Sequence, residues 1–221
     1  MTLPHRPCAV VFDMDGLLFD TEALWQEALL SAAAEAGHAI PGEVFNGSIG
    51  IRRSQCGDLF RAHFGQEFRF EAFHADWRRH FWLIAERRPA LKPGVSELLE
   101  ALDQIGLPRA IATSSSGATV ERHLAAHRLT GRFDQTVCRG DYERGKPAPD
   151  PFLKAAERLG VEPRSCLALE HSHIGVRSAA AAGMMTVMVP DLLEPTPDLR
   201  ALCIAVARDL HEVRDLVIAC A

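Results

Sequence analysis

Short apolar runs alternate along the chain with segments in which apolar residues recur at helical spacing. Six runs have the length and composition of buried strands, namely 8–12, 109–113, 134–138, 166–169, 185–189 and 203–207. Turn residues or a terminating glycine bound the helices expected between them, which are 95–105, 118–128, 151–159 and the segment from Ser172 toward Gly183. Strands that alternate with helices are typical of βαβ units. The pattern therefore predicts an α/β fold, a Rossmann-like parallel sheet flanked by helices.

Residues 21–89 break this alternation. Helical spacing repeats here over 22–36, 53–63 and 71–87, with no convincing strand between these segments. The sequence therefore predicts two domains: an α/β core made of 1–20 and 90–221, and a small helical domain, 21–89, inserted after the first strand. Four large aromatic residues of the insert are expected to pack within it: Trp25, Trp77, Phe81 and Trp82.

Composition narrows the class of partner. A net charge of −5 without a basic run argues against nucleic acid as a partner. No apolar stretch approaches the ~18 residues needed to span a bilayer, and the first residues lack the regions of a signal peptide. The six cysteines form no C-x-x-C pair, which indicates a reduced protein. We therefore expect a cytoplasmic monomer or homodimer that acts on a small molecule, with no nucleic-acid or membrane partner.

Four polar motifs follow or lie between the predicted strands, in the order Asp13-Met14-Asp15-Gly16, Thr113-Ser114-Ser115, Gly145-Lys146-Pro147 and Leu169-Glu170-His171-Ser172. In an open parallel sheet, ligands bind at the carboxyl ends of the strands. The motifs supply a nucleophile, an acid/base, hydroxyl and amide donors, a fixed cation and acidic groups for a metal. That inventory suits phosphoryl transfer, in which positioning and electrostatic stabilisation provide most of the catalysis.

In type, order and approximate spacing, these motifs resemble those of the haloacid dehalogenase superfamily, in its phosphatase branch with a helical cap. The resemblance covers nearly the whole chain. It is strongest toward small sugar-phosphate phosphatases of the 2-deoxyglucose-6-phosphate type, and nearly as strong toward β-phosphoglucomutase. It implies a metal-dependent phosphatase that hydrolyses a small phosphorylated metabolite, such as a sugar phosphate, through an aspartyl-phosphate intermediate. A phosphomutase is the alternative enzyme, and a nearly inactive protein that binds a phosphorylated ligand is the alternative outside catalysis.

By this resemblance, Asp13 is the nucleophile, and Asp15 is the acid/base whose backbone carbonyl also binds the metal. Thr113 and the amide of Ser114 hold the phosphoryl oxygens, while Lys146 neutralises charge. Asp15 argues against dehalogenation, because the dehalogenases of the superfamily lack this second carboxylate. The other candidate substrate contacts are Gly16, Glu22, Arg52 and Arg53. For the two arginines, the basic start of an ordinary helix is an equally good interpretation.

The fourth motif departs from the family pattern at His171, where phosphatases of this branch carry a metal-binding aspartate. The implied metal ligands are Asp13, Asp15, Glu170 and His171. Mg²⁺ is the expected cofactor, but it prefers oxygen ligands, and an imidazole suits Mn²⁺ or Co²⁺ better. Three accounts stay open: an active enzyme with altered metal binding, a nearly inactive relative, or a substituted or bystander histidine whose place Glu170 takes.

Other histidines are expected to be structural or solvated. His123 and His127 lie four residues apart and share a helix face, but the glutamate of an H-E-x-x-H zinc motif is missing. A solvated helix face is the favoured interpretation of this pair. His173 forms H-S-H with His171, but both rings need not face one ion if the chain leaves the strand here.

Overall fold

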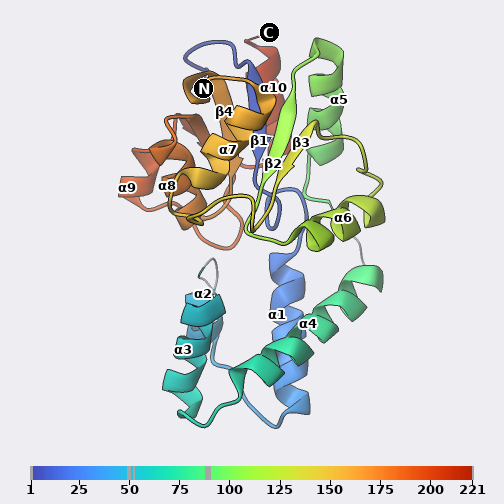
Figure 1. Ribbon diagram of the computed structural model, residues 1–221, viewed down its shortest axis with the longest axis vertical. Helices are drawn as coiled ribbons and strands as arrows, with labels where there is room; N and C mark the ends of the chain where they lie inside the picture. The colour runs from blue at the N-terminus through green and yellow to red at the C-terminus, as the bar shows by residue number, and fades with distance from the viewer. Residues whose placement is uncertain (1, 49–50, 52, 88–90, 221) are drawn as a thin grey trace. The chain divides into compact units, whose positions relative to one another are not determined.

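The computed structural model describes residues 2–48, 51, 53–87 and 91–220, without the side chains of Glu22, Glu86 and Arg87. The chain divides into two compact units (Figure 1). The core unit consists of Met1–Asp20 and Ala90–Ala221, and the helical unit consists of Thr21–Pro89.

A parallel sheet forms the centre of the core unit, and its six described strands follow the order β3-β2-β1-β4-β5-β6. The strands are β1 (Ala9–Phe12), β2 (Arg109–Ala112), β3 (Gln135–Val137), β4 (Cys166–Glu170), β5 (Met185–Met188) and β6 (Ala205–Val206). Each falls within or next to one of the predicted runs, so the predicted α/β fold is confirmed. The strand order is that of doubly wound sheets, which bind ligands where the winding reverses direction, here beside β1.

Helices cover both faces of this sheet because strand side chains alternate between the faces. Val10 and Phe12 of β1 belong to a cluster with α5 (Val95–Ile105), α6 (Gly117–Ala126) and α10 (Leu210–Ile218). Ala9 and Val11 face the other cluster, with α7 (Asp150–Leu159) and α8 (His173–Ala181). Alanines dominate this second cluster. Because their side chains are small, α7 can pack across β1, β2 and β3 (Figure 1).

Shorter elements complete the core unit: a 3₁₀ turn, η1 (Pro163–Ser165), and α9 (Pro197–Arg200).

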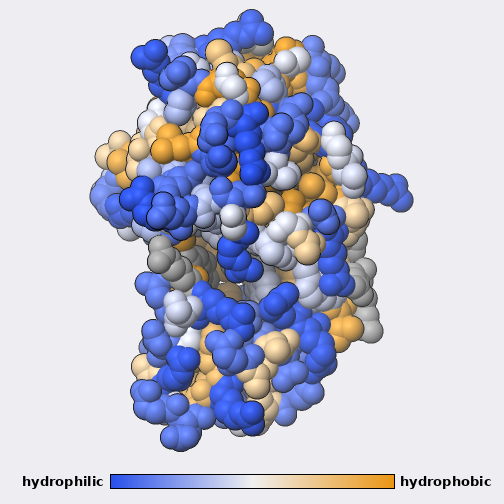
Figure 2. Space-filling view, in the orientation of Figure 1, coloured by the Kyte–Doolittle hydropathy of each residue, from blue (hydrophilic) through white to orange (hydrophobic). Residues whose placement is uncertain are grey.

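Polar and charged side chains dominate the face shown in Figure 2, with apolar side chains in separate patches. Among the described helices, none combines the length and the apolar character that a bilayer crossing requires.

Helices alone make up the described part of the helical unit: α1 (Glu22–Glu35), α2 (Gly42–Ser48), α3 (Arg53–Phe64) and α4 (Phe70–Arg87). Trp25 stacks on Phe81 with ring centroids 4.0 Å apart, and the indole N–H of Trp77 donates to the carbonyl of Trp25 at 2.8 Å. Trp82 packs against the same cluster. The prediction that these aromatic residues form the core of the insert is confirmed.

The predicted solvated histidine face on α6 is wrong for His123, which is only 2% exposed. Its ring stacks on Phe19 at a centroid distance of 4.9 Å, and His127 contacts the same phenyl ring at 4.4 Å. The sequence pattern missed this contact because Phe19 comes from the loop after β1, about a hundred residues earlier. Burial lowers the pKa of His123 to about 4, with a smaller effect from the neighbouring His127.

Candidate active site

The sheet register brings three of the sequence motifs to one edge. Phe12 at the end of β1 pairs with Ile111 of β2 on one side and with Leu169 of β4 on the other. The amide of Asp13 continues this ladder by donating to the carbonyl of Leu169 at 3.0 Å. The polar residues that follow the three strands therefore meet at the carboxyl edge of the sheet.

The turn after β1 requires its glycine. Gly16 has a φ of +80°, which glycine adopts at little cost, and its amide donates to the carbonyl of Phe19 at 3.0 Å. A Cβ at this position would lie 2.6 Å from Nε2 of His171. Gly16 therefore allows both the turn and the close packing of the imidazole against it, and its predicted substrate contact stays a prediction.

Lys146 joins two carboxylates. Its Nζ donates to Oδ1 of Asp13 at 2.7 Å and to Oε1 of Glu170 at 2.5 Å. All three residues are buried, and the ammonium also lies 5.0 Å from the centre of the Phe152 ring on α7. Buried charges are tolerated only when they are paired and hydrogen-bonded. The predicted fixed cation thus lies directly beside the predicted nucleophile.

This contact sets the charge of both groups. Burial alone raises the pKa of the Asp13 carboxyl, but the Lys146 ammonium and the contact with His171 outweigh burial and lower that pKa to about 2. Burial alone lowers the pKa of Lys146, but the charges of Asp13 and Glu170 raise it above its usual value. At neutral pH, Asp13 is therefore a carboxylate and Lys146 a cation, as nucleophilic attack on a phosphate requires.

Glu170 anchors both Lys146 and the turn into α8. While its Oε1 accepts from Lys146, its Oε2 accepts from the amides of His171 and Ser172, at 2.9 and 3.1 Å, and from the hydroxyl of Ser172 at 3.1 Å. A Cβ on Gly175 would collide with this carboxylate. The fourth motif therefore needs glycine in the first turn of α8, which sequence reasoning did not single out.

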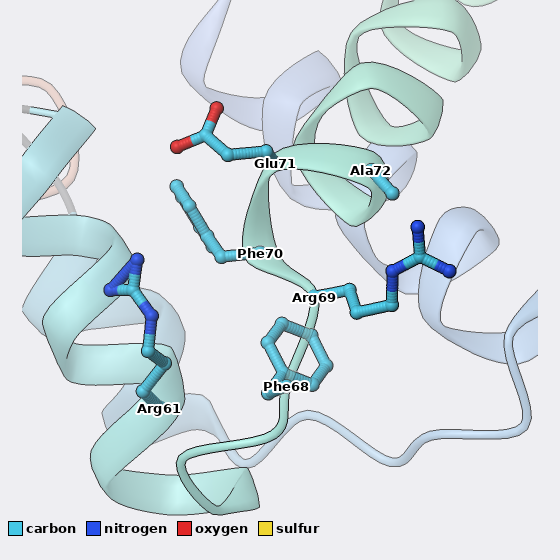
Figure 3. A pocket seen from close by; sticks show the side chains of 6 residues that line it. All are labelled: Arg61, Phe68, Arg69, Phe70, Glu71 and Ala72. Carbon is cyan, nitrogen blue, oxygen red and sulfur yellow. The ribbon is translucent and has the colours of Figure 1, made fainter.

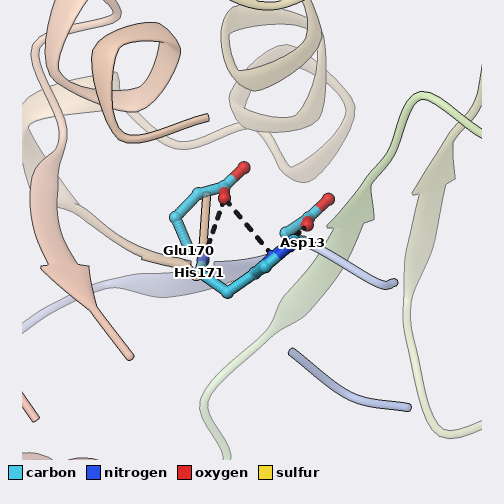
Figure 4. Close-up of side chains that lie close together, drawn as sticks. All are labelled: Asp13, Glu170 and His171. Carbon is cyan, nitrogen blue, oxygen red and sulfur yellow. Dashed lines mark hydrogen bonds and ion pairs between the residues drawn. The ribbon is translucent and has the colours of Figure 1, made fainter. Parts of the chain in front are cut away.

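His171 faces the predicted nucleophile. Its Nδ1 lies 3.1 Å from Oδ2 of Asp13 and 3.8 Å from Oε2 of Glu170, and the residue is 8% exposed. Figure 4 shows its ring reaching from the end of β4 toward Asp13, with Glu170 beside it. The imidazole is therefore part of the buried cluster, which disfavours a bystander histidine. His173 is separate, because its Nε2 contacts the carbonyl of Glu194 at 2.9 Å.

Asp13, Glu170 and His171 form a group that could hold a metal ion, with ligand atoms within 4.8 Å of one another. Both oxygens of Glu170 already accept hydrogen bonds, so the donors best placed for an ion are Oδ2 of Asp13 and Nδ1 of His171. A mixed oxygen and nitrogen set fits a divalent ion of intermediate softness. It fits Mg²⁺ less well, since Mg²⁺ favours an octahedral shell of oxygens.

The remaining motif residues lie on the loops after β1 and β2. Thr113 is buried, and its Oγ1 accepts from the amide of Ser115 at 3.1 Å, while Ser114 is exposed. The hydroxyl of Ser115 donates to Oδ2 of Asp15 at 2.7 Å. Sequence reasoning named Ser115 within its motif but gave it no role, because no local pattern links it to Asp15. The metal contact predicted for the Asp15 carbonyl stays a prediction.

The predicted substrate contacts in the helical unit are not all described. Arg52 and the side chain of Glu22 lie outside the described residues. Arg53 begins α3 and forms an ion pair with Glu71 of α4, which agrees with the interpretation as an ordinary helix start.

An open pocket in the helical unit contains none of the predicted site residues. Figure 3 shows its lining, which consists of Arg61, Phe68, Arg69, Phe70, Glu71 and Ala72. Two of its charged groups are already paired, Arg61 with Asp58 at 3.1 Å and Glu71 with Arg53. The candidate active site is therefore the buried cluster of the core unit.

Known proteins resemble the chain over most of its length. The family model of haloacid dehalogenase-like hydrolases matches residues 9–183. A probable pseudouridine-5'-phosphatase from Drosophila melanogaster is 38% identical over 187 residues, which are 82% of this chain and 80% of that protein. Hexitol phosphatase B from Escherichia coli K12 is 34% identical over 86% of both chains. The crystal structure of a putative β-phosphoglucomutase from Thermotoga maritima matches with a TM-score of 0.81 at 26% identity, covering 96% of this chain and 99% of that one.

Proposed function

The chain belongs to the haloacid dehalogenase-like hydrolase family, and on this premise we propose that it is a phosphatase that hydrolyses a small phosphate monoester through an aspartyl-phosphate. One observation carries the proposal: the buried ammonium of Lys146 lies between Asp13 and Glu170, at the carboxyl edge of the sheet. This arrangement keeps a carboxylate ionised next to a fixed positive charge. Both are needed when an anionic nucleophile attacks a phosphate dianion, because the positive charge offsets the repulsion between the two.

In the first step, a carboxylate oxygen of Asp13 attacks phosphorus. The bond from phosphorus to the ester oxygen breaks, and the leaving oxygen takes a proton from Asp15. Lys146 offsets the charge that builds up between nucleophile and phosphate, while Thr113 and the amide of Ser114 orient the phosphoryl oxygens. The products of this step are an alcohol and a phosphorylated Asp13.

In the second step, a water molecule attacks phosphorus and gives a proton to Asp15. The bond between phosphorus and the Asp13 oxygen breaks, so inorganic phosphate leaves and both carboxyl groups return to their starting states. The same residue thus acts first as acid and then as base. Lys146 remains in place through both steps, because Glu170 also accepts a hydrogen bond from its ammonium group.

Asp13 and His171 would hold a divalent ion, with Glu170 beside them, and the bound ion would supply positive charge to the phosphoryl oxygens. We propose that Mn²⁺ or Co²⁺ supports activity better than Mg²⁺, since one of the nearest donors is an imidazole nitrogen. A nearly inactive protein is the alternative if no ion suffices.

The substrate we propose is a small phosphorylated metabolite, with sugar phosphates as the first candidates. The names of the relatives suggest pseudouridine 5'-phosphate and hexitol phosphates as the first compounds to assay. The predicted use of residues 21–89 as a cap that reads the substrate, through Glu22, Arg52 and Arg53, remains part of this proposal.

The test is phosphate release from a panel of phosphate esters, repeated with Mg²⁺, Mn²⁺, Co²⁺ and Zn²⁺. Asp13→Asn is the matched control, because it keeps the shape of the side chain and removes the nucleophilic charge. We expect the wild type to release phosphate and Asp13→Asn to release none. After rapid quenching in acid, the wild-type protein should carry covalently bound phosphate. Equal release by wild type and Asp13→Asn would contradict the proposal.

A phosphomutase is the second candidate, because the chain matches a putative β-phosphoglucomutase over nearly its whole length. A mutase passes the phosphoryl group from Asp13 to a second hydroxyl instead of water. Isomerised sugar phosphate without inorganic phosphate would favour it. If a phosphate ester raises the melting temperature but gives neither product, the chain is a binding protein instead.

A further inference from the structure

A hydrogen bond joins two loops of the candidate site. The hydroxyl of Ser115, after β2, donates to Oδ2 of Asp15, after β1, at 2.7 Å, across 100 residues of chain. Both residues are half-buried. The separation of the two oxygens is the usual one for a hydroxyl donor, so this contact restricts the rotation of the Asp15 carboxyl group.

The backbone of Ser115 is itself held from two directions. Its amide donates to Oγ1 of Thr113 at 3.1 Å, and its carbonyl accepts from the amide of Arg139 at 2.8 Å. The next residue, Ser116, caps α6 by accepting from the amide of Thr119 at 3.3 Å. The Ser115 hydroxyl therefore projects from a braced loop, as a group that orients another side chain must.

We propose that Ser115 is a positioning residue that holds the Asp15 carboxyl group in the orientation for proton transfer. The inference rests on the proposed function, in which Asp15 protonates the leaving oxygen and then takes a proton from water. Ser115 keeps its own proton throughout, and only its bond to Oδ2 matters. Without this hydrogen bond, the Asp15 carboxyl group rotates. It then no longer protonates the leaving oxygen while the bond to phosphorus breaks.

Leaving-group chemistry separates this role from a general structural one. An alkyl phosphate, such as a sugar phosphate, leaves as an alkoxide and needs the proton of Asp15. A p-nitrophenyl phosphate leaves as a stable phenolate and does not. The second step, attack by water, is common to both ester types, so the first turnover must be followed by rapid mixing.

The experiment compares wild type with Ser115→Ala on both ester types. We expect the first-turnover rate on the alkyl phosphate to fall about 10- to 100-fold, as for a misplaced catalytic group, with little change in KM. The first burst of p-nitrophenolate should change less than about twofold, because this leaving group needs no proton from Asp15. Ser115→Thr keeps the hydroxyl and should restore most of the alkyl-phosphate rate.

A double variant tests whether Ser115 acts through Asp15. In the Asp15→Asn background, Ser115→Ala should cause no further loss, because the group it orients is gone. An equal loss in both backgrounds would overturn the inference, as would equal losses on both ester types. A rise in KM with kcat unchanged would instead assign Ser115 to substrate binding.

The outcomes also separate this inference from the proposed function. If the wild type forms no phosphorylated Asp13, the proposed function fails. If it forms this intermediate and Ser115→Ala leaves the alkyl-phosphate rate unchanged, only the role of Ser115 fails. Thermal unfolding of each variant shows whether it is folded. If Ser115→Ala is not, Ser115→Cys takes its place in the same comparison, because a thiol is a much weaker hydrogen-bond donor than a hydroxyl.

Discussion

Replacing His171 with aspartate should convert the cluster into a stronger metal site that is unstable without a metal. The imidazole Nδ1 lies 3.1 Å from Oδ2 of Asp13, so a carboxylate at position 171 would add a third buried negative charge beside Asp13 and Glu170. Lys146 is the cation that contacts both of those carboxylates. The added charge therefore repels its neighbours in the empty site and attracts a divalent cation.

The magnitude follows from the separation. Two like charges ~4 Å apart repel by about 4 kcal/mol at an effective dielectric of about 20. The attraction of Lys146 offsets part of this repulsion, so we expect His171→Asp to lose roughly 1–3 kcal/mol of folding free energy in a chelator. A bound divalent ion removes the repulsion, and each 1.4 kcal/mol corresponds to about tenfold in affinity. The affinity for Mg²⁺ should therefore rise roughly 5- to 140-fold.

Two measurements check this prediction: calorimetric titration with Mg²⁺ and Mn²⁺, and thermal unfolding with chelator or with excess metal. His171→Asn is the matched control, because it removes the imidazole without adding charge. We expect His171→Asp alone to show a melting temperature that depends strongly on Mg²⁺. The reasoning is refuted if His171→Asp binds Mg²⁺ no more tightly than the wild type and is equally stable in chelator.

Three further outcomes follow from the buried groups. Lys146→Met should abolish phosphate release and lower the free energy of unfolding by about 3–5 kcal/mol, because Asp13 and Glu170 lose their shared cation; denaturant titration measures the loss, and undiminished stability would contradict it. Gly175→Ala should lower stability by roughly 1–3 kcal/mol, because its Cβ meets the Glu170 carboxylate; thermal unfolding tests this, and an unchanged melting temperature would count against the clash. The pKa of His123 is lowered to about 4 in the folded protein, so the ring takes up a proton on unfolding below pH 6.5. The free energy of unfolding should therefore be constant above that pH, as far as His123 is concerned, and fall by up to about 3 kcal/mol as the pH drops to 4. His123→Phe should flatten this part of the stability profile, and an unchanged slope would contradict the assignment.

The architecture and the family could be predicted from the amino-acid sequence. Strand runs and helix boundaries are local patterns, so the parallel sheet and helices such as 95–105 were predictable, and the family resemblance of the motifs is confirmed. Three helices of the described chain lie outside the predicted ranges, the four-residue α9 among them. The sequence of α2 is rich in poor helix formers, so packing of Val44 and Phe45 stabilises it rather than propensity. The helix α10 has apolar residues at helical spacing and buries Leu210, Val213, Leu216 and Val217.

The candidate residues came from the four motifs and from the family resemblance that they carry, whereas the contacts between these residues depend on the folded chain. Lys146 reaches Asp13 across 133 residues and Glu170 across 24 residues. Ser115 reaches Asp15 across 100 residues, and Phe19 buries His123. No local sequence pattern predicts these pairs, because such a pattern indicates only which face of its own helix or strand a side chain lies on. Which charge meets which partner, and therefore each group's pKa, depends on how neighbouring strands align their ends.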